Sequence, residues 1–173
     1  GMGEVIKYGC IFDQSLFQRL ASYSSFEELY EDIDEIIYRC VDIKRDVVER
    51  DQFDFGDRLL LNFGHTLGHA IEQYYHYQTY SHGEAVGIGM YQLSLISQKL
   101  GLTKEGTANQ IKKALDLYHL PSMAHVPVKD LKKAMALDKK NINQKLNFVL
   151  LKEIGNCFIY PSDLSLIDES QEV

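Results

Sequence analysis

The sequence lacks the features that would place it in a membrane or among disulfide-stabilised secreted proteins. Its longest apolar runs, such as Leu59–Leu61 and Phe148–Leu151, are far too short to cross a bilayer, and no secretory leader opens the chain. It has three widely spaced cysteines, Cys10, Cys40 and Cys157, a pattern that favours reduced thiols over a disulfide framework or a zinc knuckle. We therefore expect a cytoplasmic protein without a membrane partner.

An excess of positive charge is also missing. The chain has 18 Lys and Arg against 25 Asp and Glu, a formal net charge of -7, which argues against a nucleic-acid partner. An anionic small molecule is still compatible, because a local group of basic side chains can bind it. The Gly-rich strand-to-helix turn of dinucleotide-binding domains does not occur, so we expect most of any nucleotide site to lie outside this chain.

What the sequence does have is helical periodicity in a chain of 173 residues, long enough for one domain with a full core. Overlapping S-x-x-E capping boxes at Ser24 and Ser25, and another at Ser81, mark helix starts, and Gly101 marks a stop. Two apolar runs flank Lys-Glu-Ile-Gly and predict a hairpin. The fold class is therefore mainly α, a multihelical array with a small β-hairpin near the C-terminus, followed by a polar segment from Pro161 that we expect to fray. The predicted helices span about 25–50, 58–77, 81–100, 104–118 and 128–137, and the predicted strands 145–151 and 156–160.

Histidines are concentrated in one part of the chain. Four of the six lie within eighteen positions, and His65 and His69 are four apart on a predicted helix, which puts both on one face. His82 follows at the start of the next predicted helix. Imidazole nitrogens and carboxylate oxygens are zinc ligands, so a divalent-metal site is one interpretation and ordinary surface or core histidines are the other. Spacing favours His65 and His69 as a chelating pair, with an acid that it does not identify.

Several basic and polar side chains could accompany this site. Lys7 follows Glu4 by three positions, for which a solvated ion pair is the ordinary interpretation. Arg58 and Asn62 share the predicted helix face of His65, where an arginine could hold a carboxylate or phosphate. The remaining candidates are Lys44, late in a helix, and the pair Lys139 and Lys140.

In order and spacing, several segments resemble 3-dehydroquinate synthase. They are GEVIKYG (residues 3–9), LLNFGHTLGHAIE (60–72), HGEAV (82–86), and DKK (138–140) followed by LNFVLL (146–151) and IG (154–155). The resemblance runs from residue 3 to about 155 and covers the helical C-terminal half of that enzyme. It implies that residues 1–173 form a single helical metal- and substrate-binding domain, a fragment without the N-terminal NAD-binding α/β domain.

The resemblance also implies roles for individual residues. Glu4, His65 and His82 match metal-ligand positions, for Zn2+ or Co2+, so His69 becomes a substrate-side residue. Gly3 stands where the motif more often has alanine, which we expect only to loosen a turn. The positions that match the substrate surroundings, and thus the catalytic set, are Lys7, Lys44, Arg58, Asn62, His69 and one lysine of the Lys139–Lys140 pair, for which we favour Lys139.

The activity that the resemblance implies is the conversion of 3-deoxy-D-arabino-heptulosonate 7-phosphate to 3-dehydroquinate and phosphate, in the shikimate pathway of aromatic amino-acid biosynthesis. NAD acts catalytically in this phosphate-eliminating lyase reaction, so we expect the fragment alone to be inactive. Homo-oligomerisation of the full-length enzyme is left open.

Three alternatives remain at this stage. Another sugar-phosphate cyclase would make a different carbocycle. An iron- or zinc-dependent alcohol or glycerol dehydrogenase shares the histidine spacing, but a neutral alcohol needs no basic set. A non-catalytic metal-binding module would leave its basic side chains in solvent.

Overall fold

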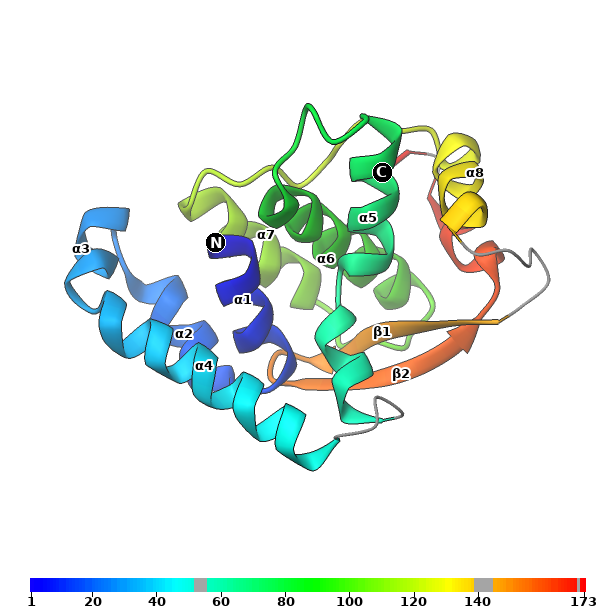
Figure 1. The fold of residues 1–173 in the computed structure, drawn as a ribbon. Helices are drawn as coiled ribbons and strands as arrows, with labels where there is room; N and C mark the ends of the chain where they lie inside the picture. The colour runs from blue at the N-terminus through cyan, green and yellow to red at the C-terminus, as the bar shows by residue number, and fades with distance from the viewer. Residues whose placement is uncertain (52–55, 139–144, 171) are drawn as a thin grey trace.

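The computed structural model describes residues 1–51, 56–138, 145–170 and 172–173. These residues form a mainly helical array with one antiparallel hairpin near the C-terminus, as predicted (Figure 1). The α-helices are α1 (Met2–Ile11), α2 (Gln14–Ser22), α3 (Phe26–Glu31), α4 (Ile33–Arg50), α5 (His65–Tyr74), α6 (His82–Lys99), α7 (Thr107–Leu117) and α8 (Val128–Asp138). The strands are β1 (Leu146–Glu153) and β2 (Asn156–Ser162), and the 3-10 helices are η1 (Asp57–Asn62) and η2 (Leu164–Glu169). Helices α1 and α2 occupy a stretch for which periodicity predicted no range.

The single helix predicted over residues 25–50 is wrong, because α3 and α4 are separated at Asp32. The Asp32 carboxylate receives the Arg19 guanidinium at 2.9 Å and the Tyr23 hydroxyl at 2.6 Å. Arg19 lies in the last turn of α2, and Tyr23 directly follows that helix. A periodicity pattern does not contain this contact, so it continues through the break.

The single helix predicted over residues 58–77 is wrong as well. The 3-10 helix η1 comes first, and α5 starts only at His65, after Gly64 in the left-handed conformation with φ of +77°. A Cβ on Gly64 would lie 2.6 Å from the Val86 carbonyl oxygen of α6. The chain therefore turns here because it passes directly over the backbone of another helix.

Helix α6 lies at the centre of the fold and packs against α1, α5, α7, β1 and η2 (Figure 1). The predicted capping box of Ser81 and Glu84 is present. Gly101 takes a positive φ of +71° just after the helix, as a C-terminal stop requires. Because α6 is buried on nearly every side, its apolar residues are spread around the helix rather than gathered on one face, and the buried side chains include Gln92, Ser94 and Ser97.

The hairpin of β1 and β2 contributes to two clusters of the hydrophobic core. Val149 and Leu151 pack with residues of α1, α2, α4 and α7. Phe148 and Leu150 face the opposite way and pack with residues of α5, α6 and α8. The predicted hairpin is confirmed, and because both of its faces are buried it ties the two clusters together.

The polar segment that was expected to fray is ordered instead. Strand β2 continues through Pro161 to Ser162, and η2 follows it. Val173 is fully buried and exchanges backbone hydrogen bonds of 2.9 and 3.0 Å with Val126. A few apolar residues in a polar segment suffice to dock it when their partners lie elsewhere in the chain.

All three cysteines are free, and Cys10 and Cys40 are buried. Burial raises the pKa of the Cys40 thiol to about 11, so it stays protonated. No helix among the described residues has both the length and the apolar character needed to cross a membrane.

Candidate metal centre and adjoining pocket

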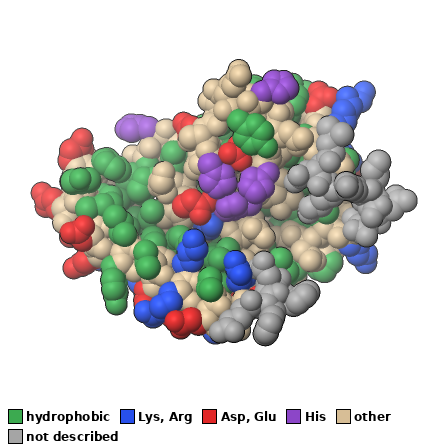
Figure 2. All heavy atoms as spheres, in the orientation of Figure 1, with side chains coloured by type: hydrophobic (Ala, Val, Ile, Leu, Met, Phe, Trp, Pro, Cys, Tyr) green, Lys and Arg blue, Asp and Glu red, His purple; other side chains and the backbone are tan. Residues whose placement is uncertain are grey.

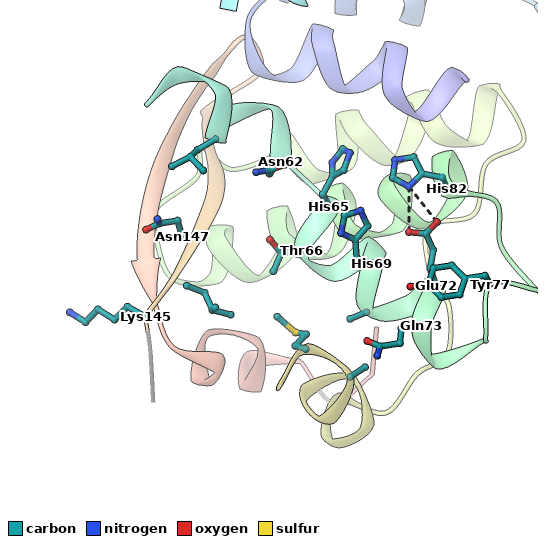
Figure 3. A pocket seen from close by; sticks show the side chains of 15 residues that line it. Asn62, His65, Thr66, His69, Glu72, Gln73, Tyr77, His82, Lys145 and Asn147 are labelled. Atoms are coloured by element: carbon teal, nitrogen blue, oxygen red, sulfur yellow. Dashed lines mark hydrogen bonds and ion pairs between the residues drawn. The ribbon is translucent and has the colours of Figure 1, made fainter. Parts of the chain in front are cut away.

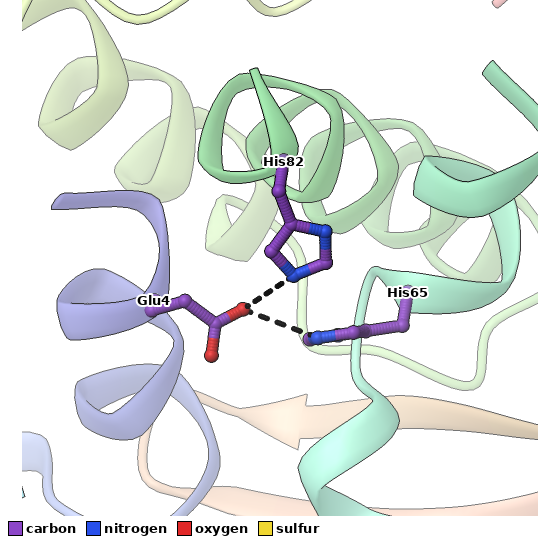
Figure 4. Close-up of side chains that lie close together, drawn as sticks. All are labelled: Glu4, His65 and His82. Atoms are coloured by element: carbon purple, nitrogen blue, oxygen red, sulfur yellow. Dashed lines mark ion pairs between the residues drawn. The ribbon is translucent and has the colours of Figure 1, made fainter. Parts of the chain in front are cut away.

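Three side chains from the first turns of three helices converge on one point (Figure 4). Glu4 lies in the first turn of α1, while His65 opens α5 and His82 opens α6. Glu4 Oε1 lies 3.1 Å from His65 Nε2 and 3.5 Å from His82 Nε2. Ligand atoms of a tetrahedral zinc site with bonds of about 2.0–2.1 Å are themselves about 3.3 Å apart. The separations therefore fit a divalent ion held between these side chains.

The hydrogen bonds around the two imidazole rings support the same conclusion. His65 Nδ1 lies 3.1 Å from the Phe63 carbonyl oxygen, which can only accept, and His82 Nδ1 lies 3.3 Å from the Glu72 carboxylate. A neutral imidazole that donates from Nδ1 presents an unshared electron pair on Nε2. Glu4 Oε1 is buried without a hydrogen-bond partner among the described residues. Three electron-pair donors thus face one another, an arrangement that a cation stabilises.

Lys7 forms an ion pair with the other carboxylate oxygen of Glu4, with Nζ 2.6 Å from Oε2. Burial would raise the pKa of Glu4, but its neighbours, among them Lys7 with its hydrogen bond and positive charge, lower that pKa to about 2. Burial also lowers the pKa of Lys7 below its usual range, against the attraction of Glu4. The interpretation of this pair as solvated is wrong, because Lys7 is only 3% exposed.

Close backbone contacts hold the first turns of α1, α5 and α6 in place. A Cβ on Gly3 would lie 2.1 Å from the carbonyl oxygen of Gly83, and one on Gly89 would lie 2.1 Å from that of Gly64. Gly3 therefore does not loosen a turn, as we expected from the sequence. It lies inside α1 where the backbone of α6 leaves no room for a side chain.

A pocket of about 820 Å³ opens beside the three side chains, between α5, α8, η1 and the start of β1 (Figure 3). His65, His69 and His82 all contribute to its wall, and their ring centres lie 5.1 to 5.7 Å from one another. Figure 2 shows a cluster of His side chains on this face of the molecule. Figure 2 also shows Lys and Arg side chains on the same face, next to the histidines. The other lining residues are Leu59, Asn62, Thr66, Ala70, Glu72, Gln73, Tyr77, Ala134, Met135, Lys145, Leu146 and Asn147.

The pairing of His65 with His69, which spacing favoured, is not the arrangement that the geometry favours. Their ring centres are 5.6 Å apart, and His65 groups with Glu4 and His82 instead. His69 belongs to a second group, with Glu72 and His82, whose ligand atoms lie within 4.8 Å of one another. His65 and His69 share one face of α5, but the packing of α1 decides which of the two rings contacts Glu4.

Of the remaining predicted site residues that the structure describes, only one lines the pocket. Asn62, at the end of η1, lines the pocket, whereas Arg58 and Lys44 are not among its described lining residues. Arg58 and Asn62 do not share a helix face with His65, because η1 and α5 are separate. Lys44 on α4 is exposed, yet its charge reaches Lys7 and helps to lower the pKa of that lysine. Lys139 lies outside the described residues.

Glu72 is the buried site residue to which sequence reasoning gave no role. It lies three residues after His69 and seven after His65, spacings that place all three along one face of α5. That spacing was visible in the sequence. Lys145, just before β1, and Asn147, within β1, also line the pocket, but their approach depends on how the hairpin packs beside η1.

Comparisons with known proteins agree with this fold. A family model described as 3-dehydroquinate synthase C-terminal matches residues 1–141. The 3-dehydroquinate synthase of Clostridium perfringens (strain SM101 / Type A) is 51% identical over 169 residues, which are 97% of this chain and 48% of that protein. That of Clostridium acetobutylicum is 47% identical over 160 residues, 92% of this chain and 45% of the relative. The chain thus spans about half the length of the curated relatives it matches.

Solved structures with the same architecture are more distant in sequence. ValA, the 2-epi-5-epi-valiolone synthase from Streptomyces hygroscopicus subsp. jinggangensis 5008 with NAD+ and Zn2+ bound, aligns with a TM-score of 0.80 at 20% identity. The alignment covers 96% of this chain and 48% of the ValA chain. A 2-deoxy-scyllo-inosose synthase complexed with carbaglucose-6-phosphate, NAD+ and Co2+ aligns with a TM-score of 0.79 at 22% identity, covering 98% and 50%. At such identities the likeness shows the fold alone.

Proposed function

The chain belongs to the family of 3-dehydroquinate synthase C-terminal domains, and we propose that it is the metal- and substrate-binding part of such an enzyme. In this proposal the complete protein converts 3-deoxy-D-arabino-heptulosonate 7-phosphate to 3-dehydroquinate and phosphate. The identity of 51% with a 3-dehydroquinate synthase across 97% of the chain supports this choice over other cyclases. NAD would bind mainly to a nucleotide-binding part of the protein outside this chain.

The observation that carries the proposal is the convergence of Glu4, His65 and His82 on one point. Their donor atoms have the separations and electron pairs that Zn2+ or Co2+ takes as ligands. Once bound there, the ion would act as a Lewis acid on neighbouring hydroxyl groups of the substrate. Glu4 would stay ionised for this role, because Lys7 holds its other oxygen.

The pocket beside this point suits a substrate with a phosphate and a carboxylate. His69 and Asn62 line it and carry donors that can orient a phosphate group. Lys44 and Arg58 are proposed to meet the carboxylate, with Lys139 as a further cation. Holding the substrate in one pose matters here, because elimination, reduction and ring closure must follow one another on the same molecule.

Metal binding by this chain is the first test. We expect one Zn2+ per chain in calorimetry, and at least a tenfold weaker affinity in Glu4→Gln, His65→Asn and His82→Asn. His125→Asn is the matched control, since His125 is exposed and its ring is paired only with Glu172 in the described structure. Equal binding by all four variants would refute the metal centre.

Turnover is the second test. We expect no phosphate release from the heptulosonate phosphate, with NAD and zinc present, by the chain alone. Release should appear when a separately produced N-terminal half of the Clostridium perfringens relative is added. A phosphorylated sugar without the carboxylate is the comparison substrate, and preference for it would favour a different sugar-phosphate cyclase.

A further inference from the structure

Glu72 is a buried carboxylate on α5 that the proposed chemistry leaves without a role. It is 8% exposed, and its two carboxylate oxygens each lie 3.3 Å from His82 Nδ1 (Figure 3). Within the described residues, no lysine or arginine forms an ion pair with it. A carboxylate in such a position costs free energy unless a hydrogen-bond donor compensates it, and the facing donor is the His82 ring.

The direction of this hydrogen bond fixes the chemistry of the opposite side of the ring. An ionised carboxylate can only accept, so the proton of a neutral His82 lies on Nδ1. Its Nε2 then presents an electron pair toward Glu4 Oε1, 3.5 Å away. The Phe63 carbonyl oxygen does the same for His65, at 3.1 Å from Nδ1. Each histidine of the centre thus has its own acceptor on the side away from the ion.

His82 needs such an acceptor more than His65 does. The side chain of His82 is 46% exposed, whereas that of His65 is 14% exposed. Packing alone therefore leaves the His82 ring more free to rotate about its side-chain torsions. Glu72, two helical turns after His65, lies on the same rigid helix as that first ligand. A contact from Glu72 thereby sets the His82 ring relative to His65.

We propose that Glu72 is the positioning residue of the metal centre, which orients the His82 ring and holds its Nε2 electron pair toward the ion. This inference rests on the metal centre of the proposed function. Removing the hydrogen-bond acceptor of a metal-bound histidine typically lowers metal affinity by about 10–100-fold. The alternative is that Glu72 is itself a ligand of a second ion, together with His69 and His82. A ring whose Nδ1 donates to Glu72 cannot also offer that nitrogen to a metal.

The test measures metal affinity and ligand geometry, without any assay of turnover. Zn2+ affinity is determined by competition with a chromophoric chelator, and the visible absorption of the Co2+-loaded chain reports the ligand field. We expect Glu72→Ala to bind Zn2+ about 10–100-fold more weakly and to shift the Co2+ bands. Glu72→Gln keeps an oxygen acceptor of nearly the same size, so it should retain the fold and recover part of the affinity. Glu49→Gln, an exposed acid of α4, removes the same charge elsewhere and should change neither quantity.

The outcomes separate this inference from the proposal beneath it. If Glu4→Gln loses binding while Glu72→Ala and Glu72→Gln match the unaltered chain, Glu72 does not position His82 and only this inference fails. If Glu4→Gln binds Zn2+ as well as the unaltered chain, the metal centre itself fails. If two ions bind and the second is lost in both His69→Asn and Glu72→Gln, Glu72 is a ligand and the positioning role is overturned.

Discussion

The junction of α1, α5 and α6 and the outer surface of α4 are built in different ways. At the junction, the backbones of neighbouring elements are in direct contact. A Cβ on Gly3 would lie 2.1 Å from the carbonyl oxygen of Gly83, and a Cβ on Gly89 would lie 2.1 Å from the carbonyl oxygen of Gly64. The junction also contains Lys7, a lysine that is 3% exposed. Few side chains could be exchanged there without moving a helix.

The surface of α4 depends on solvated side chains instead. Arg45 pairs with Asp42 at 2.6 Å and with Asp46 at 3.0 Å, and the arginine side chain is 55% exposed. Ile37 and Val41 of the same helix are exposed by more than half. Exposed ion pairs contribute little and tolerate substitution. The difference shows that the backbone leaves little room for substitution where three helices bring three ligand atoms together, and much more on the surface of α4.

The largest effect is expected for Gly64→Ala, at the start of α5. A positive φ costs an alanine about 1–2 kcal/mol. The new Cβ would also lie 2.5 Å from Met90 Cγ and 2.6 Å from the Val86 carbonyl oxygen, so overpacking should add about 1–3 kcal/mol. We expect the free energy of unfolding in urea to fall by about 3 kcal/mol. Gly101→Ala is the control, since Gly101 has a similar φ of +71° and nothing within 4 Å, and it should lose only the first contribution. Equal losses would contradict the tight junction.

A smaller effect is expected for Lys7→Met. It leaves the Glu4 carboxylate, 30% exposed, without its cation, which should lower the free energy of unfolding of the metal-free chain by about 2 kcal/mol. The matched control is Lys112→Met, which breaks the exposed pair of Lys112 with Asp116 in α7 and should cost about 0.5 kcal/mol or less. If urea unfolding showed the two variants to be alike, the ion pair of the junction would be no different from a surface pair.

The smallest effect is expected for Arg45→Ala on α4. Its partner Asp46 is 48% exposed, and Asp42 keeps a second cation in Arg39 at 3.2 Å, so the free energy of unfolding should change by about 0.5 kcal/mol or less, and 1 M salt should reduce even that difference. Thermal unfolding at low and high ionic strength measures both. A loss of about 2 kcal/mol that persists in salt would mean that the α4 surface is specified as tightly as the junction.

Local sequence patterns predicted those parts of the fold whose interactions are local. The Ser81 capping box, the Gly101 stop and the hairpin around Gly155 each depend on residues within a few positions of one another. The breaks at Asp32 and Gly64 were missed because the contacts made there, with Arg19 of α2 and with the backbone of α6, come from other elements. The docking of Val173 on Val126 was missed for the same reason.

For the site, the sequence by itself determined that histidines and a suitable acid were available, and its resemblance to a known family named Glu4, His65 and His82. Helical spacing alone favoured His65 with His69, since it describes one helix at a time. Only the tertiary structure brought α1 and α6 against the start of α5, and so decided which histidine meets Glu4 and which carboxylate lies behind His82. The physical reason is that spacing fixes directions within an element, whereas distances between elements depend on packing, here on glycines that let backbones approach.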